Sequence, residues 1–267
     1  LAAERMRGGA AAPKAEAGSG VEGESVIGGD ARRTDSVDKV TGRAMYVEDR
    51  RIPGMLHVKV LRSPYHHARL MRLSTEKAEA LEGVVRVVTA ADIPGDNGLG
   101  DYSRDEPVLT PVGDTVRMKG APVALVVATS PERAEAGAEM VDAVYEPLPH
   151  VFKVEESLGD GAFPIYEGGN VLTVETEAHG DLEAAFEASD VVLETTYRTA
   201  WQEHAALERE TLLGYYDEAD RLTVVGGTHE PHWQQRYIAS ALAIDPERVR
   251  VIMPPTGGSF GGKQDPW

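Results

Sequence analysis

The chain has 267 residues, 42% of them apolar, which is enough for two domains with packed cores. Acidic residues outnumber basic ones by 44 to 27, and the net charge of −17 argues against nucleic-acid binding, which needs clustered Lys and Arg. The absence of cysteine excludes disulfides and cysteine-ligated iron–sulfur clusters within this chain. The longest apolar run, 121–128, is far shorter than the ~20 residues that cross a bilayer, so no membrane span is expected.

Residues 1–35 predict a linker or an extended arm, because they are rich in Ala, Gly and Glu and have no sustained apolar period. The chain begins with Leu rather than Met, so we expect it to be a piece of a longer polypeptide. The first residues also lack the apolar stretch of a secretory signal, which makes a cytoplasmic location the default expectation.

Residues 36–150 predict one compact domain of helices and strands. Period-2 alternation or β-branched composition favours strands at 56–60, 69–73, 84–89 and 122–128. Ser74 is placed to cap a short helix over 75–82, and Ser130 with Pro131 to begin a longer one.

A connector is expected over 151–175, followed by a second region of mixed α/β structure over 176–267. Its expected elements are a helix over 181–188, a strand over 191–197, a hairpin of 211–216 and 222–225, a helix from Pro231 to Leu242 and a strand over 249–253. Trp233 and Tyr237 are expected to lie on the buried face of the longer helix. The last strand leads directly into a glycine-rich loop.

That loop, 254–264, is the most informative stretch, because four glycines fall in the six positions from Gly257 to Gly262. Glycine permits positive φ and lets backbone N–H groups approach a ligand closely, which suits phosphates and metal-oxo groups. A tight turn without a ligand is the simplest alternative. A nucleotide-binding Walker A loop fits poorly, because Gln264 stands where that motif needs a Ser or Thr hydroxyl for Mg²⁺.

The stretch 257–263, GGSFGGK, closely resembles the GGxFGGK loop of the molybdenum hydroxylases, the family of xanthine dehydrogenase and aldehyde oxidase. Residues 202–208, QEHAALE, resemble that family's QEHxxLE stretch, and 62–68 resemble a segment common there. The resemblance covers roughly residues 30–267. It implies an α+β or mixed α/β fold, with an α/β hammerhead-like domain over 36–150 followed by part of a molybdopterin-binding domain over 176–267.

The resemblance implies part of a molybdenum-dependent hydroxylase or dehydrogenase that oxidises an aldehyde or an N-heterocycle with water as the oxygen source. It implies a molybdopterin-type Mo cofactor at this chain. Because the chain has no cysteine, the accompanying 2Fe–2S clusters are expected on other domains or subunits, and the resemblance implies that FAD lies there as well. The remaining expected partners are the rest of the large subunit and a small-molecule substrate.

The same resemblance assigns site residues one by one. Cofactor contacts are expected from the loop and from the residue in place of a family glutamine near the metal: Gly257, Gly258, Ser259, Phe260, Gly261, Gly262 and His229. Phe260 and Gln264 are expected to border the substrate pocket, and Gln264 stands where xanthine-type members carry Glu, which argues against a purine. The family's general-base glutamate is expected beyond Trp267, so no catalytic residue is assigned here and the piece alone should be inactive.

Three other sets of side chains have simpler interpretations. His229 and His232 are too few for a direct metal site. For the pair Glu203 and His204, a buried structural role is favoured over acid–base chemistry. For histidines 66 and 67, a surface or packing role is favoured. Two alternative functions stay open. The chain could be a noncatalytic assembly module or split subunit that completes a cofactor site, or, more distantly, a P-loop-like nucleotide-binding protein.

Overall fold

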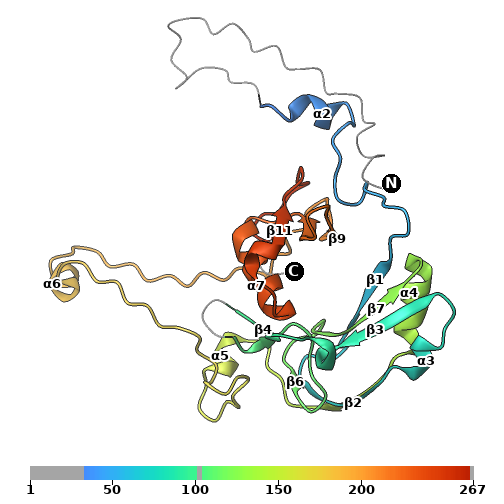
Figure 1. Cartoon of the computed structure of the whole chain (residues 1–267). Helices are drawn as coiled ribbons and strands as arrows, with labels where there is room; N and C mark the ends of the chain where they lie inside the picture. The colour runs from blue at the N-terminus through green and yellow to red at the C-terminus, as the bar shows by residue number, and fades with distance from the viewer. Residues whose placement is uncertain (1–32, 101–103, 265–267) are drawn as a thin grey trace, which may run out of the picture.

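The structure is a computed structural model that describes residues 33–100 and 104–264 (Figure 1). The predicted arm therefore lies almost wholly outside the described residues. The elements in chain order are α2 (Ser36–Val40), β1 (His57–Arg62), β2 (Ala68–Ser74), α3 (Glu76–Glu79), β3 (Val84–Thr89), η2 (Ala90–Asp92), β4 (Gly98–Leu99), β5 (Glu106–Pro107), β6 (Thr115–Val116), β7 (Pro122–Ala128), α4 (Pro131–Met140), β8 (Asp142–Pro147), α5 (Val154–Ser157), α6 (Leu182–Glu187), β9 (Leu212–Tyr216), β10 (Leu222–Gly226), α7 (Pro231–Leu242), η3 (Pro246–Arg248) and β11 (Val249–Ile252).

The first region is built on two three-stranded antiparallel sheets, β1-β7-β3 and β6-β2-β8. The four predicted strands are confirmed as β1, β2, β3 and β7. β7 takes the central place in its sheet because it is the most continuously apolar segment, and Val123, Ala124 and Val126 are fully buried. A second core forms where Leu70 and Val116 of the other sheet pack with Val123 of β7.

Helix α4 covers the β1-β7-β3 sheet and begins as the sequence predicts. The Ser130 hydroxyl accepts a hydrogen bond from the Arg133 N–H at 3.2 Å, and Pro131 occupies the first helical position. Gly137 allows the close approach, because a Cβ at this position would lie 2.8 Å from a methyl of Val126 and 2.9 Å from one of Val84. The helix therefore packs almost directly on the strands.

Helix α3 is shorter than predicted, so the expectation of a helix over 75–82 capped by Ser74 was wrong. Ser74 is the last residue of β2, where it pairs with Asp142 of β8. The N-cap is Thr75, and its side chain makes no capping hydrogen bond. Pairing within the sheet thus extends one residue into the stretch that the local signal assigned to the helix.

The second region contains the sheet β11-β10-β9. β9 and β10 form the predicted antiparallel hairpin, and β10 pairs with β11 in parallel, with Val225 opposite Ile252. Helix α7 makes the crossover between these two parallel strands (Figure 1). The predicted helix and the final strand are both confirmed. Trp233 was expected to be buried, but it is half exposed: its ring stacks on the buried Tyr237 with 6.2 Å between centroids, and Arg236 lies over it at 5.2 Å.

The predicted strand over 191–197 is absent from the part of the chain that the structure describes. Its alternating apolar side chains lie in solvent, with Leu193 88% and Tyr197 86% exposed. Alternation produces a strand only where a neighbouring edge supplies hydrogen bonds, and no described strand pairs with this stretch. The nearby short helix is confirmed as α6, on a long excursion from the two sheet regions (Figure 1), and Asp181 caps it by accepting from the Ala184 N–H at 3.0 Å.

One place where the two regions meet is the loop after η2, which reaches the C-terminal end of α7. The N–H groups of Gly95 and Asp96 donate to the carbonyls of Ala241 and Ser240, each at 3.0 Å. A helix end leaves carbonyls short of intrahelical donors, and this loop supplies donors to two of them from a distant part of the chain. No helix within residues 33–100 and 104–264 is long and apolar enough to cross a membrane.

Candidate functional site

The candidate site lies after the ends of two parallel strands, β10 and β11. The carboxyl ends of parallel strands meet at one edge of a sheet, which is where open α/β sheets bind ligands. The glycine loop follows β11, and residues 227–229 follow β10. The His229 N–H donates to the Lys263 carbonyl at 3.1 Å, so the structure brings His229 to the end of the loop through its main chain, while its side chain is exposed.

The loop turns around Ser259. This side chain is buried, its hydroxyl accepts from the Lys263 N–H at 3.1 Å, and its carbonyl accepts from the Gly262 N–H at 2.9 Å. Gly258 and Gly261 have φ of +108° and +94°, values that L residues rarely adopt. Phe260 lies between them at φ +53° and is the non-glycine residue of the loop held in the left-handed region.

The tip of the loop presents unused hydrogen-bond donors. Within the described ranges, the N–H groups of residues 258–261 make no hydrogen bond to another group. Unpaired backbone N–H groups in a turn that contains left-handed residues can bind anions or metal-oxo groups. The Phe260 side chain is 76% exposed beside these donors, and Gln264 is exposed, with its N–H donating to the Gly261 carbonyl at 3.2 Å.

The stretch 202–208 runs along the loop and leaves no room for larger residues. A Cβ on Gly257 would lie 2.7 Å from the Cβ of Glu208, and one on Gly262 would lie 3.0 Å from the His204 ring. A Cβ on Gly258 would lie 3.5 Å from the Cβ of Ala206, which is an ordinary van der Waals contact. The two motifs, which are separate in the sequence, therefore form one packed unit. The loop needs its glycines for two reasons: they leave room for the stretch 202–208, and they adopt the positive φ angles.

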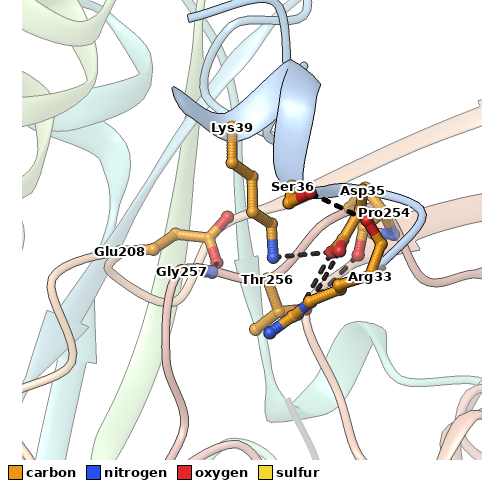
Figure 2. A network of polar contacts seen from close by, with 8 residues as sticks. All are labelled: Arg33, Asp35, Ser36, Lys39, Glu208, Pro254, Thr256 and Gly257. Atoms are coloured by element: carbon orange, nitrogen blue, oxygen red, sulfur yellow. Dashed lines mark hydrogen bonds and ion pairs between the residues drawn. The ribbon is translucent and has the colours of Figure 1, made fainter. Parts of the chain in front are cut away.

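A buried ion pair joins these motifs. The Lys263 Nζ lies 2.9 Å from the Oε2 of Glu208, and the two side chains are only 3% and 9% exposed. The same Oε2 accepts the Gly257 N–H at 2.8 Å, and Figure 2 shows the carboxylate beside this amide. The other oxygen, Oε1, is buried and has no partner within the described chain.

Sequence reasoning missed the roles of Glu208 and Lys263, although both lie inside the quoted motifs. A lysine at the end of a glycine-rich loop requires a nearby anion if its side chain points inward. That signal says that an acid is needed but does not say which of the 44 in the chain supplies it. Only the fold, which places 202–208 against the loop, identifies the partner.

The close-up also contains a separate chain of ion pairs on the segment around α2. Asp35 lies 2.5 Å from the Arg33 guanidinium and 2.8 Å from the Lys39 ammonium (Figure 2). These contacts lower the pKa of Asp35 far below its ordinary range, chiefly through the hydrogen bond from Arg33. Arg33 is largely exposed, so this group belongs to the surface rather than to the buried base of the loop.

The other histidine candidates have simple places in the structure. Glu203 and His204 were expected to form a buried pair, and this was wrong: their side chains are 87% and 48% exposed, with 3.8 Å between the charged atoms. His66 packs against His150 and Phe152, as the packing interpretation expects. Within the described ranges, no three His, Asp or Glu side chains come together as metal ligands.

In comparisons with known proteins, each of the two regions matches the model of a protein family. Residues 41–149 match the family model described as aldehyde oxidase and xanthine dehydrogenase, a/b hammerhead domain. Residues 165–267 match the model of the molybdopterin cofactor-binding domain.

Two similar proteins and one solved structure illustrate these matches. The chain is 37% identical over 240 residues to the nicotinate dehydrogenase large molybdopterin subunit of Eubacterium barkeri, covering 90% of this chain and 56% of that subunit. It is 35% identical over 241 residues to the xanthine dehydrogenase molybdenum-binding subunit of Escherichia coli O157:H7, covering 87% of this chain and 32% of that protein. It superposes on the aldehyde oxidoreductase of Desulfovibrio desulfuricans with a TM-score of 0.81 and 28% identity, covering 88% of this chain and 27% of that one. The chain thus spans less than two thirds of the length of each of these relatives.

Proposed function

This chain belongs to the aldehyde oxidase and xanthine dehydrogenase family of molybdenum hydroxylases, and from that premise we propose that it forms part of a molybdenum-dependent hydroxylase or dehydrogenase. The proposed enzyme oxidises an aldehyde or an N-heterocycle and takes its oxygen atom from water. This chain supplies the hammerhead domain, proposed as residues 36–150, and one wall of the molybdopterin site, within residues 176–267. A cytoplasmic location is part of the same proposal.

The observation that carries the proposal is the run of N–H groups at residues 258–261, which have no hydrogen-bond partner within the described chain and lie in a turn with left-handed residues beside an exposed Phe260. A molybdopterin cofactor brings oxo and phosphate oxygens, which accept such hydrogen bonds, so the residues present fit this group. When bound, the cofactor supplies the redox-active metal at which oxygen is transferred to carbon. The loop supplies fixed donors that need no rearrangement on binding.

The side chains around the loop have separate proposed roles. Phe260 borders the substrate side, where its exposed ring would hold a planar or apolar group. Gln264 offers a neutral amide to the substrate, in place of a charged carboxylate. His229, whose main chain is fixed to Lys263, is proposed to place its imidazole beside the cofactor.

The names of the relatives point to two candidate substrate classes for the proposed enzyme. Nicotinate dehydrogenase and quinoline 2-oxidoreductase of Pseudomonas putida are named for N-heterocycles, and the Desulfovibrio enzyme is named for aldehydes. The chain has no cysteine, so any iron–sulfur cluster with cysteine ligands would lie on partner domains or subunits, and the flavin is proposed to lie there too.

Lys263 argues against the nucleotide-binding alternative. The lysine of a Walker A loop reaches the β- and γ-phosphates of the nucleotide. Here the ammonium is buried against Glu208 and lies on the opposite side of the loop from solvent. Phosphate binding would first have to break this pair.

A glycine exchange in the complete enzyme, with its partner subunits, tests the proposal. We expect Gly258→Ala to lower the molybdenum and pterin content about ten-fold, because the left-handed backbone is strained by a Cβ and the donor row is displaced. Gly113→Ala is the matched control, because Gly113 has φ +93° and no atom within 4 Å of an added Cβ. Elemental analysis and pterin fluorescence after oxidation are the measurements, and a complete wild-type assembly without molybdenum would refute the function.

A further inference from the structure

We propose that Glu208 is a positioning residue that closes the base of the glycine loop by joining its two ends through one oxygen atom. The Oε2 of Glu208 accepts the Gly257 N–H at 2.8 Å, at the start of the loop, and the Lys263 ammonium at 2.9 Å, at its end. The role rests on the proposed function, because it concerns how the same loop presents its donors.

Burial makes this junction rigid. Both side chains are at least nine-tenths buried, so water cannot replace either partner without opening the packed unit. Removing one member of a buried pair leaves the other charge without compensation, which is far more costly than replacing both. The Lys263 stem also fills the space over Gly227, where a Cβ would lie 3.3 Å from the lysine Cδ, so the ammonium has a defined path to the carboxylate.

The junction controls the part of the loop that faces a ligand. The four free N–H groups lie between the two residues that Glu208 joins, so the distance between Gly257 and Lys263 sets their spacing. Glu208 also donates its own N–H to the Gly257 carbonyl at 3.3 Å, which holds the segment 202–208 in register with the loop. The carboxylate therefore acts through the backbone and does not itself need to touch the cofactor or the substrate.

The decisive variant is the double exchange Glu208→Gln with Lys263→Met in the complete enzyme. It breaks the link between the two ends of the loop, because Met at position 263 has no donor for residue 208, and it leaves no buried charge, so we expect it to fold and assemble like the wild type. Its molybdenum content should nevertheless be about ten-fold lower, and the Mo(V) electron paramagnetic resonance spectrum of the reduced enzyme should change. Each single exchange should reduce the molybdenum content further, since each leaves one partner without its counterpart.

The exposed ion pair of Lys59 and Glu135, at 2.7 Å, provides the control. Glu135→Gln should leave the molybdenum content and the spectrum unchanged. A double variant with wild-type molybdenum content and a wild-type spectrum would overturn the positioning role while leaving the proposed function intact. A wild-type enzyme without molybdenum would instead refute the proposed function. If a single variant does not fold, the double variant still decides.

Discussion

Asp217, in the turn of the β9–β10 hairpin, shows how one carboxylate organises a turn. It accepts the N–H groups of Ala219 and Arg221 and the Arg221 side chain, at 2.9, 3.0 and 3.1 Å. The backbone N–H of Arg221 makes the largest contribution to a pKa of Asp217 below its ordinary value. Within the acidic run 217–220, Asp217 is therefore a structural acceptor.

The sign of the pH dependence follows from the lowered pKa. Asp217 contributes stability that is fully present above the unfolded pKa of about 3.9 and is lost as the pH falls through the folded pKa. We therefore expect Asp217→Asn to lose less stability than the wild type between pH 7 and pH 3, measured by urea unfolding at each pH. Asp220→Asn is the control in the same turn, since that side chain is 83% exposed. Equal pH dependence of wild type and Asp217→Asn would contradict the assignment.

The sequence predicts some elements better than others. The difference is whether an element depends on residues close to it in the chain or on residues far away. Helix α4 and the hairpin were predictable, because their caps, turns and apolar faces are local. The strand over 191–197 was not, because a strand needs an edge to pair with. In the site, the glycine loop was singled out by resemblance, and the cofactor and substrate contacts assigned to it stay predictions. The Glu208–Lys263 junction was not, because it depends on which distant segment the fold places beside the loop.

The capping of α4 provides a test at this scale. Ser130→Ala removes the hydroxyl that accepts the Arg133 N–H and should lower the free energy of unfolding by about 1 kcal/mol. Thr75→Ala at the N-cap of α3 is the comparison, because that side chain makes no capping hydrogen bond and its loss should be much smaller. Chemical denaturation of both variants measures the difference, and equal losses would argue against a capping role for Ser130.

At the scale of the molecule, the loop after η2 fastens the first region to the second. A Cβ on Gly95 would lie 2.0 Å from the Ser240 carbonyl oxygen, so no larger residue fits without moving the loop away from α7. The two hydrogen bonds at the helix end would be lost together.

We expect Gly95→Ala to destabilise the protein by about 2 kcal/mol and to speed amide hydrogen exchange at the C-terminal end of α7. Gly168→Ala is a fair control, because Gly168 does not have a positive φ and an added Cβ meets nothing within 4 Å. Hydrogen-exchange mass spectrometry on both variants tests the expectation. Unchanged exchange in α7 of Gly95→Ala would show that the two regions are held together elsewhere.

The junction at Glu208 has a further consequence for the order of folding. Glu208 contacts Gly257 and Lys263, which lie 49 and 55 positions further along the chain, beyond the β9–β10 hairpin and the α7 crossover. Contacts between distant positions form after local ones, because the intervening chain must first be ordered. The hairpin and the crossover unit should therefore form before the glycine loop takes its shape, and the donor row becomes competent to hold a cofactor only as a late step of folding.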